Sequence, residues 1–243
     1  MEGKLSVPTP RIMLADETRS LFALNFLVMT KLDGESLIDL EPALDRSEVF
    51  PIYEQMGRLL REIHCIAMES FGYVGPQGVL TPVDSNRAYM LSQFEKKLGG
   101  LLEYGAPARL AARLREFVER HTPLLDGCTS PSLCHYDFHT GNILGKRRDK
   151  AVRLSGILDL ENAIAGDPLM DIAKTLNYSV RDDAAKRDGL LAGYGTIDRA
   201  DWRETVALYE LYGVLELWCW WKLIGDDQRA TTLLPSLERF AAI

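Results

Sequence analysis

The first forty residues alternate between short apolar stretches and turn signals. An apolar stretch at 11–15 follows a proline-rich segment, and the stretch at 21–32 is almost continuously apolar up to a glycine turn. Proline disfavours the α region for the residue before it, and a short apolar run bounded by turn residues is typical of a strand. The pattern therefore predicts a short strand at 11–15 and a buried strand at 21–32.

Later in the chain the apolar residues recur mostly every three or four positions, which is the period of an amphipathic helix. Between 143 and 158 the period returns to two on either side of a charged turn, and this predicts a β-hairpin. The predicted helices cover 47–68, 86–102, 106–120, 168–179, 182–193, 200–224 and 226–242. The predicted fold class is α+β, with a β-rich start, a long helical body and one hairpin inside that body.

Composition narrows the classes of function. Of the 243 residues 47% are hydrophobic and 26% are charged, as in ordinary globular proteins. A net charge of −7 without any long basic run argues against a nucleic-acid partner. The most apolar segment, 206–224, is interrupted by Glu210, Glu216 and Lys222, so it predicts a buried helix and no membrane span. Four cysteines without CxxC spacing, and a start without a signal-peptide pattern, predict a cytoplasmic location.

His135, Asp137 and His139 alternate along one segment, and their spacing is compatible with two chemistries. Imidazole and carboxylate groups bind zinc or iron, so the first possibility is an HxDxH metallohydrolase. A further ligand would be needed, and the other histidines, His64 and His121, fall in predicted helices. The metallohydrolase is therefore a distant alternative.

The second possibility depends on residues farther along the chain. Asn142 follows Asp137 by five positions, and Asp159 ends an apolar strand after the predicted hairpin. Phosphoryl transfer from a nucleotide uses one carboxylate to accept the proton of the attacking hydroxyl, and an amide oxygen with another carboxylate to hold magnesium. An Asp–x4–Asn loop, a hairpin and an acid at a strand end form the catalytic layout of kinases.

Four segments resemble motifs of the aminoglycoside phosphotransferase-like enzymes, which are small-molecule kinases with a protein-kinase-like fold. Residues 135–144, HYDFHTGNIL, resemble the HGDxHPGNxL loop of this family. Residues 157–173, ILDLENAIAGDPLMDIA, resemble its IDWExAxxGDPxxDLA segment. Residues 59–72 look like its LaxLHxxxxxxFG helix, and residues 26–37 look like its nucleotide hinge. The resemblance runs in order from about residue 7 to the C-terminus.

The resemblance implies roles for residues at matching positions. Asp137 would be the catalytic base, and Asn142 and Asp159 would bind Mg²⁺. The residues that would position the catalytic loop are His135, His139 and Asp171. Backbone groups that would hold the purine of ATP or GTP belong to Met29, Thr30 and Lys31. Asp167 is expected to cap the helix that begins near Pro168.

The chain also departs from the family pattern. Tyr136 replaces the usual glycine of the loop, and Thr140 replaces the usual proline. Strands that normally carry a glycine-rich loop and a phosphate-binding lysine do not precede residue 7, so 1–32 is expected to be a remnant of the nucleotide lobe. The helical catalytic and substrate lobe would then cover 33–243. A catalytically impaired nucleotide-binding protein or fragment is the main alternative, and exposed N-terminal strands would favour self-association.

The resemblance implies that the acceptor is a hydroxyl group of a small molecule. An aminoglycoside-like antibiotic, and hence antibiotic resistance, or another amino-alcohol metabolite would fit. Acids that could bind a cationic acceptor are Glu161, Asp182, Asp183, Glu210 and Glu216. Glu210 and Glu216 lie in an aromatic helical segment, where cation–π contacts could help. The alternative is a core helix whose acids face water.

Overall fold

The computed structural model describes residues 3–149 and 151–242. Within that range the chain forms two compact units, each assembled from three stretches of sequence. Unit 1 contains the chain up to Ile63, together with Asp137–Glu161 and Ser179–Gly195. Unit 2 contains His64–Tyr136, Asn162–Tyr178 and the chain from Thr196 onward. The sequence predicted a boundary at residue 32 between a remnant of a nucleotide lobe and a helical lobe. The two units do not test that boundary, and it stays a prediction.

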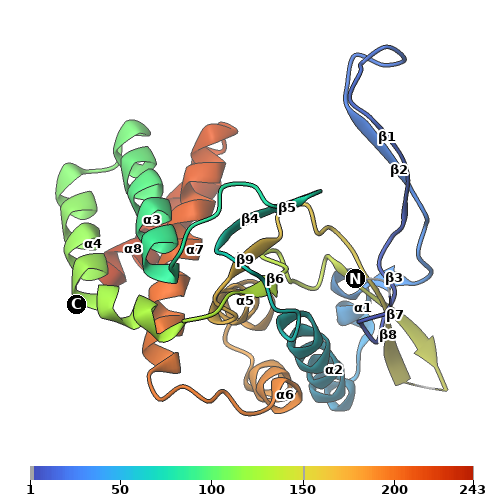
Figure 1. Ribbon diagram of the computed structural model, residues 1–243. Helices are drawn as coiled ribbons and strands as arrows, with labels where there is room; N and C mark the ends of the chain where they lie inside the picture. The colour runs from blue at the N-terminus through green and yellow to red at the C-terminus, as the bar shows by residue number, and fades with distance from the viewer. Residues whose placement is uncertain (1–2, 150, 243) are drawn as a thin grey trace. The chain divides into compact units, whose positions relative to one another are not determined.

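Unit 1 contains the predicted hairpin. Strand β7 (Ile143–Arg148) pairs antiparallel with β8 (Ala151–Ile157), and β3 (Glu35–Ser36) pairs with the other edge of β7 (Figure 1). The turn between β7 and β8 falls in the charged segment, as the period-two pattern predicted. The hairpin prediction is therefore confirmed.

The two N-terminal strands form a separate pair within unit 1. Strand β1 (Ile12–Asp16) pairs antiparallel with β2 (Phe26–Met29), and the connection between them consists of bends (Figure 1). The prediction of a buried strand across 21–32 is wrong in both length and burial, because Leu21 is 71% exposed and Leu27 is 52% exposed. An apolar run shows only that a segment can be buried, whereas burial needs a second layer of structure. Self-association through these strands stays a prediction.

Helices complete unit 1, and two of them approach closely. The helical segments are α1 (Leu37–Leu40), a 3₁₀ turn (Glu41–Ala43), α2 (Arg46–His64) and α6 (Ala184–Tyr194). Gly57 of α2 faces α6, where an added Cβ would lie 2.6 Å from the backbone nitrogen of Tyr194. Small residues at this contact let two helices that are distant in sequence enclose a core containing Tyr53, Met56, Leu60 and Leu190.

Unit 2 is mainly helical. Its helices are α3 (Asn86–Glu103), α4 (Ala108–His121), α5 (Leu169–Thr175), α7 (Trp202–Leu223) and α8 (Asp227–Ala241). A 3₁₀ helix (Thr122–Gly127) follows α4, and a π-helical segment (Leu176–Val180) follows α5 and leads back into unit 1. The predicted helices are confirmed apart from shifts at their ends. In the described residues, none of the helices is long and apolar enough to span a membrane.

Unit 2 also contains a small sheet that the sequence patterns did not predict. Its strand order is β5–β4–β9–β6, formed by Gly78–Val79, Gly72–Gly75, Ile164–Gly166 and Ser132–Cys134. Each strand has two to four residues, which is too short to show a period of two. The sheet matters for the candidate site because β6 leads directly into the segment that contains Asp137 and Asn142.

Candidate active site

The loop between β6 and β7 brings three predicted site residues together in unit 1. The side-chain amide of Asn142 donates to Asp137 twice, to its carbonyl and to its carboxylate Oδ2, both at 3.0 Å. Nε2 of His139 lies 3.5 Å from the same Oδ2. The side chains of Asp137 and His139 are 28% and 32% exposed, so the carboxylate is partly exposed to solvent.

Both ring nitrogens of His139 have neighbours within the loop. Its Nδ1 accepts the backbone N–H of Gly141 at 3.0 Å, and its Nε2 lies 3.3 Å from the side-chain nitrogen of Asn142. Nε2 is also the ring nitrogen that faces Asp137. The loop is also anchored from its other side, because the backbone N–H of Thr140 donates to the hydroxyl of Ser179 at 3.0 Å.

Asp159 lies at the same end of the hairpin as Asn142. Ile143 and Ile157 are register partners at this end, and the backbone N–H of Leu158 donates to the carbonyl of Asn142 at 2.8 Å. Asp159 is the next residue, and it is exposed with φ 62°, in the left-handed region. Asparagine and aspartate are the non-glycine residues that adopt this conformation most readily.

Asp171 organises the start of the 135–144 segment, in unit 2. Its fully buried carboxylate accepts the backbone N–H groups of His135 and Tyr136, each at 2.7 Å, and lies 3.1 Å from Nε2 of His64. Burial would raise the pKa of Asp171, but the hydrogen bond from His64, the charges of His64 and His135 and the backbone donor outweigh it and lower the pKa. Asp171 is therefore an ionised anchor for the chain that leads into Asp137.

The structure offers no support for a metal bound by the HxDxH residues. In the part of the chain that is described, the one group of three potential ligands within metal-binding reach is His64, Cys134 and Asp171. Asp171 already accepts three hydrogen bonds. Burial raises the pKa of the Cys134 thiol well above its usual value.

The five candidate acceptor-binding acids occupy different environments. Asp183 caps α6 and pairs with Arg46, whose hydrogen bond lowers the pKa of Asp183 to about 2. Glu216 pairs with Lys174 at 2.8 Å. Glu161 and Asp182 are exposed in unit 1. Burial raises the pKa of Glu210 in unit 2.

The predicted hinge residues are the last residue of β2, Met29, and the two residues that follow it, Thr30 and Lys31. The backbone N–H of Thr30 donates to the carbonyl of Arg11 at 2.9 Å, so this group is used by the β1–β2 pair. Backbone groups of successive residues in a strand point to opposite edges. The polar groups of Met29 therefore face the edge that β1 does not pair, and Lys31 lies beyond the end of the strand.

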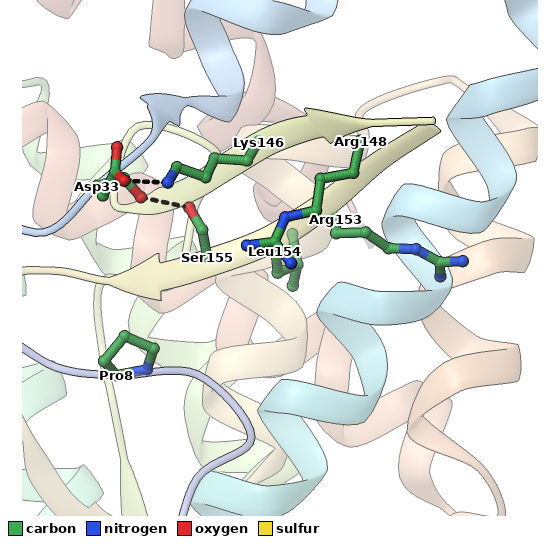
Figure 2. Close-up of a pocket in the computed structure, with 7 residues that line it drawn as sticks. All are labelled: Pro8, Asp33, Lys146, Arg148, Arg153, Leu154 and Ser155. Atoms are coloured by element: carbon green, nitrogen blue, oxygen red, sulfur yellow. Dashed lines mark hydrogen bonds and ion pairs between the residues drawn. The ribbon is translucent and has the colours of Figure 1, made fainter. Parts of the chain in front are cut away.

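A pocket of about 270 Å³ lies beside the segment that follows the hinge, and its lining is Pro8, Asp33, Lys146, Arg148, Arg153, Leu154 and Ser155 (Figure 2). Lys146 and Ser155, from the paired strands β7 and β8, converge on Asp33. The ammonium of Lys146 binds the carboxylate of Asp33, and the hydroxyl of Ser155 donates to the backbone carbonyl of Asp33 at 2.8 Å. These contacts fasten the segment after the hinge to the hairpin that carries Asn142 and Asp159.

Gly34→Ala is expected to lower the free energy of unfolding by about 1–3 kcal/mol, because a side chain at this position is strained. Gly34 has φ 138°, and an added Cβ would collide with Ser155 Oγ and lie 2.9 Å from the carbonyl oxygen of Gly145. Urea denaturation measures the loss. Gly99→Ala is the matched control, since nothing lies within 4 Å of its added Cβ and α3 should gain stability. Equal effects of the two substitutions would contradict the prediction.

Comparison with known proteins decides the family. The sequence model of the APH phosphotransferase enzyme family matches residues 2–208. The chain belongs to this family. No match was found among curated proteins.

Solved structures similar to this phosphotransferase share its fold at low sequence identity. The apo form of a thermostable mutant of aminoglycoside phosphotransferase APH(4)-Ia has a TM-score of 0.72 and 16% identity, with 97% of this chain and 78% of that chain covered. A mutant of the same enzyme in a ternary complex with ADP and hygromycin B also has a TM-score of 0.72 and 16% identity, with 98% of this chain and 77% of that chain covered. The GDP and kanamycin complex of an APH(2'') enzyme has a TM-score of 0.69 and 15% identity, with 99% of this chain and 78% of that chain covered. The protein-kinase-like fold predicted from the motifs is confirmed.

Sequence reasoning missed two features of the candidate site. It did not predict that Lys174 would pair with Glu216, or that Tyr136 would adopt φ 66°. The only available signal for Lys174 was its position three residues after Asp171 on one predicted helix, which puts both on the same face.

Proposed function

We propose that this protein moves the γ-phosphoryl group of ATP or GTP to a hydroxyl group of a small molecule, with Mg²⁺ at the reaction centre. The observation that carries the proposal is the grouping of Asp137 with the amide of Asn142, and of Asn142 with the strand end that precedes Asp159. Kinases use the same inventory of a proton-accepting carboxylate, an amide oxygen and a second carboxylate. Structures of similar fold in complex with ADP or GDP support a nucleotide substrate.

Asp137 is the proton acceptor in this proposal. Its carboxylate is partly exposed, so an acceptor hydroxyl can approach within hydrogen-bond distance. Asn142 donates to Oδ2, and Nε2 of His139 lies 3.5 Å from the same oxygen. The two neighbours fix the direction of the carboxylate, which orients the attacking oxygen and receives its proton.

The donor set of Asn142 and Asp159 fits Mg²⁺. The amide nitrogen of Asn142 is turned toward Asp137, so its Oδ1 is turned away from Asp137 and available as a ligand. Asp159 contributes an exposed carboxylate, and magnesium prefers oxygen ligands of these two kinds. When bound, the ion would neutralise negative charge on the transferring phosphates.

The nucleotide base would bind at the free edge of the hinge, through backbone groups of Met29 and Lys31. The anchoring of Asp33 by Lys146 and Ser155 would keep this edge in register with the hairpin. The residues assigned to base and magnesium binding all belong to unit 1.

For the acceptor, Glu161 and Asp182 are the acids best suited to bind a cation in unit 1, because they are exposed. Asp183 is neutralised by Arg46, and Glu216 by Lys174. Complexes of similar enzymes with kanamycin and hygromycin B support an amino-sugar or amino-alcohol acceptor.

Asp159→Asn is expected to abolish magnesium-dependent turnover while leaving magnesium-free nucleotide binding intact. Asparagine tolerates φ 62°, so the substitution removes charge without adding backbone strain. Isothermal titration with ATP and with GTP, each with and without Mg²⁺, measures binding, and a panel of aminoglycosides and amino alcohols with ³¹P NMR detects the phosphorylated product. Asp149→Asn is the matched control, since Asp149 is exposed with φ 49° at the opposite end of the hairpin.

The outcomes distinguish the proposal from its alternatives. Magnesium-strengthened nucleotide binding without any product would favour a nucleotide-binding protein that does not catalyse transfer. Stoichiometric zinc or iron in the purified protein would favour the metallohydrolase. Unchanged magnesium-dependent turnover in Asp159→Asn would contradict the assignment of Asp159.

A further inference from the structure

Tyr136, the residue before Asp137, has a backbone conformation that tyrosine rarely adopts. Its φ is 66°, in the left-handed region where a Cβ crowds the following carbonyl. A bulky residue persists in this region only where the surrounding structure holds it there. Tyr136 is also buried, with 4% of its surface exposed. The contacts that hold it are therefore informative about its role.

Two side chains of α5 hold Tyr136, one at its backbone and one at its ring. The carboxylate of Asp171 accepts its backbone N–H at 2.7 Å. The ammonium of Lys174 lies 3.6 Å from the centroid of its ring, which is cation–π contact. Asp171 and Lys174 are three residues apart on the same helix, so they present their side chains on one face.

Glu216 of α7 closes the cluster. Its Oε1 accepts the hydroxyl of Tyr136 at 2.8 Å, and its Oε2 accepts the ammonium of Lys174 at 2.8 Å. The side chains of Lys174 and Glu216 are only 9% and 19% exposed, so the pair is poorly screened by solvent. Lys97 adds a second cation at 3.8 Å from Oε1. Each carboxylate oxygen of Glu216 is thus already engaged within unit 2.

We infer that Tyr136, held by Lys174 and Glu216, is a positioning residue for Asp137. The ring and the backbone N–H of Tyr136 are both restrained, so the bonds from its Cα to Cβ and to the nitrogen have fixed directions. The direction of the remaining bond, through which the chain continues into Asp137, is therefore restricted. A glycine at position 136 would adopt the same φ without strain but would have no ring to be held. Lys174 and Glu216 act through Tyr136, and Glu216 serves this purpose in place of binding the acceptor. The inference rests on the proposed role of Asp137 as the base.

Tyr136→Phe tests the inference with little change in shape. Loss of one charge-assisted hydrogen bond that orients the base is expected to lower kcat about tenfold, with the KM for nucleotide unchanged. The amide and carboxyl NMR resonances of Asp137, assigned by comparison with Asp137→Asn, are expected to shift. Tyr209→Phe is the matched control, because Tyr209 is also buried and its hydroxyl likewise donates to a carboxylate, that of Asp167, at 2.9 Å. The control should leave kcat and the Asp137 resonances unchanged.

A double substitution separates positioning from simple structural support. If the hydroxyl acts through Glu216, then Tyr136→Phe and Glu216→Gln together should lower kcat by less than the product of their separate effects. Multiplicative effects, or Asp137 resonances that stay unmoved in Tyr136→Phe, would overturn the inference. The NMR measurement needs no acceptor. An absence of phosphoryl transfer by the unsubstituted protein would refute the proposed function, while the resonances of Asp137 would still decide the positioning role.

Discussion

Asp137→Asn is expected to lower kcat by about 10²–10⁴, the range associated with a positioned proton acceptor. The amide has nearly the same shape as the carboxylate and can still accept the hydrogen bond from Asn142, but it cannot take the proton of the attacking hydroxyl. Nucleotide affinity should stay within about twofold, because the hinge residues are unchanged. Steady-state kinetics with the acceptor found by ³¹P NMR, together with calorimetric nucleotide titration, measures both quantities.

Asp188→Asn is the control for Asp137→Asn, because Asp188 is an exposed acid of the same unit that pairs with its neighbour Arg187. It should retain full turnover. Turnover that is unchanged in Asp137→Asn would show that the loop has been misassigned. Loss of both turnover and nucleotide affinity would show that Asp137 supports the structure of the hinge side instead of accepting a proton.

Asp171→Asn is expected to lower the free energy of unfolding by about 3–5 kcal/mol, as when one partner of a buried ion pair is removed. The carboxylate is fully buried and accepts three hydrogen bonds, from His64 and from two backbone N–H groups. An amide supplies one acceptor oxygen and turns an N–H₂ group toward the remaining donors. Urea denaturation at neutral pH measures the loss, and Asp126→Asn, an exposed acid that pairs with Arg87, should change stability by less than about 0.5 kcal/mol.

The lowered pKa of Asp171 also sets the sign of a pH dependence. A carboxyl group whose pKa is lower in the folded state than in the unfolded state contributes stability above its unfolded pKa of about 3.9. That contribution is lost as the pH falls through the folded value. The difference in stability between the unsubstituted protein and Asp171→Asn should therefore be constant near neutral pH and shrink below about pH 4. A difference that grows on acidification would contradict a lowered pKa.

Much of the fold could be predicted from the sequence because its helices are long and strongly periodic. Helices α3 and α7 begin and end within two residues of the predicted bounds, and the β7–β8 hairpin falls where the period changes. The small sheet of unit 2 could not be predicted in this way. Its strands are defined by pairing between segments far apart in the chain, such as Gly72–Gly75 with Ile164–Gly166, and two to four residues show no periodicity.

The candidate site likewise has residues that the sequence predicted and contacts that it did not predict. Motif spacing singled out Asp137, Asn142 and Asp159, since the chemistry of phosphoryl transfer requires those side chains and a short loop and hairpin hold them in a narrow range of arrangements. Glu216 was weighed only as an acid that could bind an acceptor or face water. Its pairing with Lys174 and Tyr136 depends on the packing of α5 against α7, which local sequence does not encode.

The sequence by itself determined the family, the helical framework and the order of the catalytic motif, because these depend on local periodicity and on the spacing of reactive side chains within one loop and hairpin. Only the tertiary structure decided which acids keep a free charge, which apolar strand lies exposed, and why a tyrosine can occupy φ 66° beside Asp137. Charge pairing and burial are properties of neighbours in space. The residues that neutralise Asp183 and Glu216 lie 137 and 42 positions away in the chain.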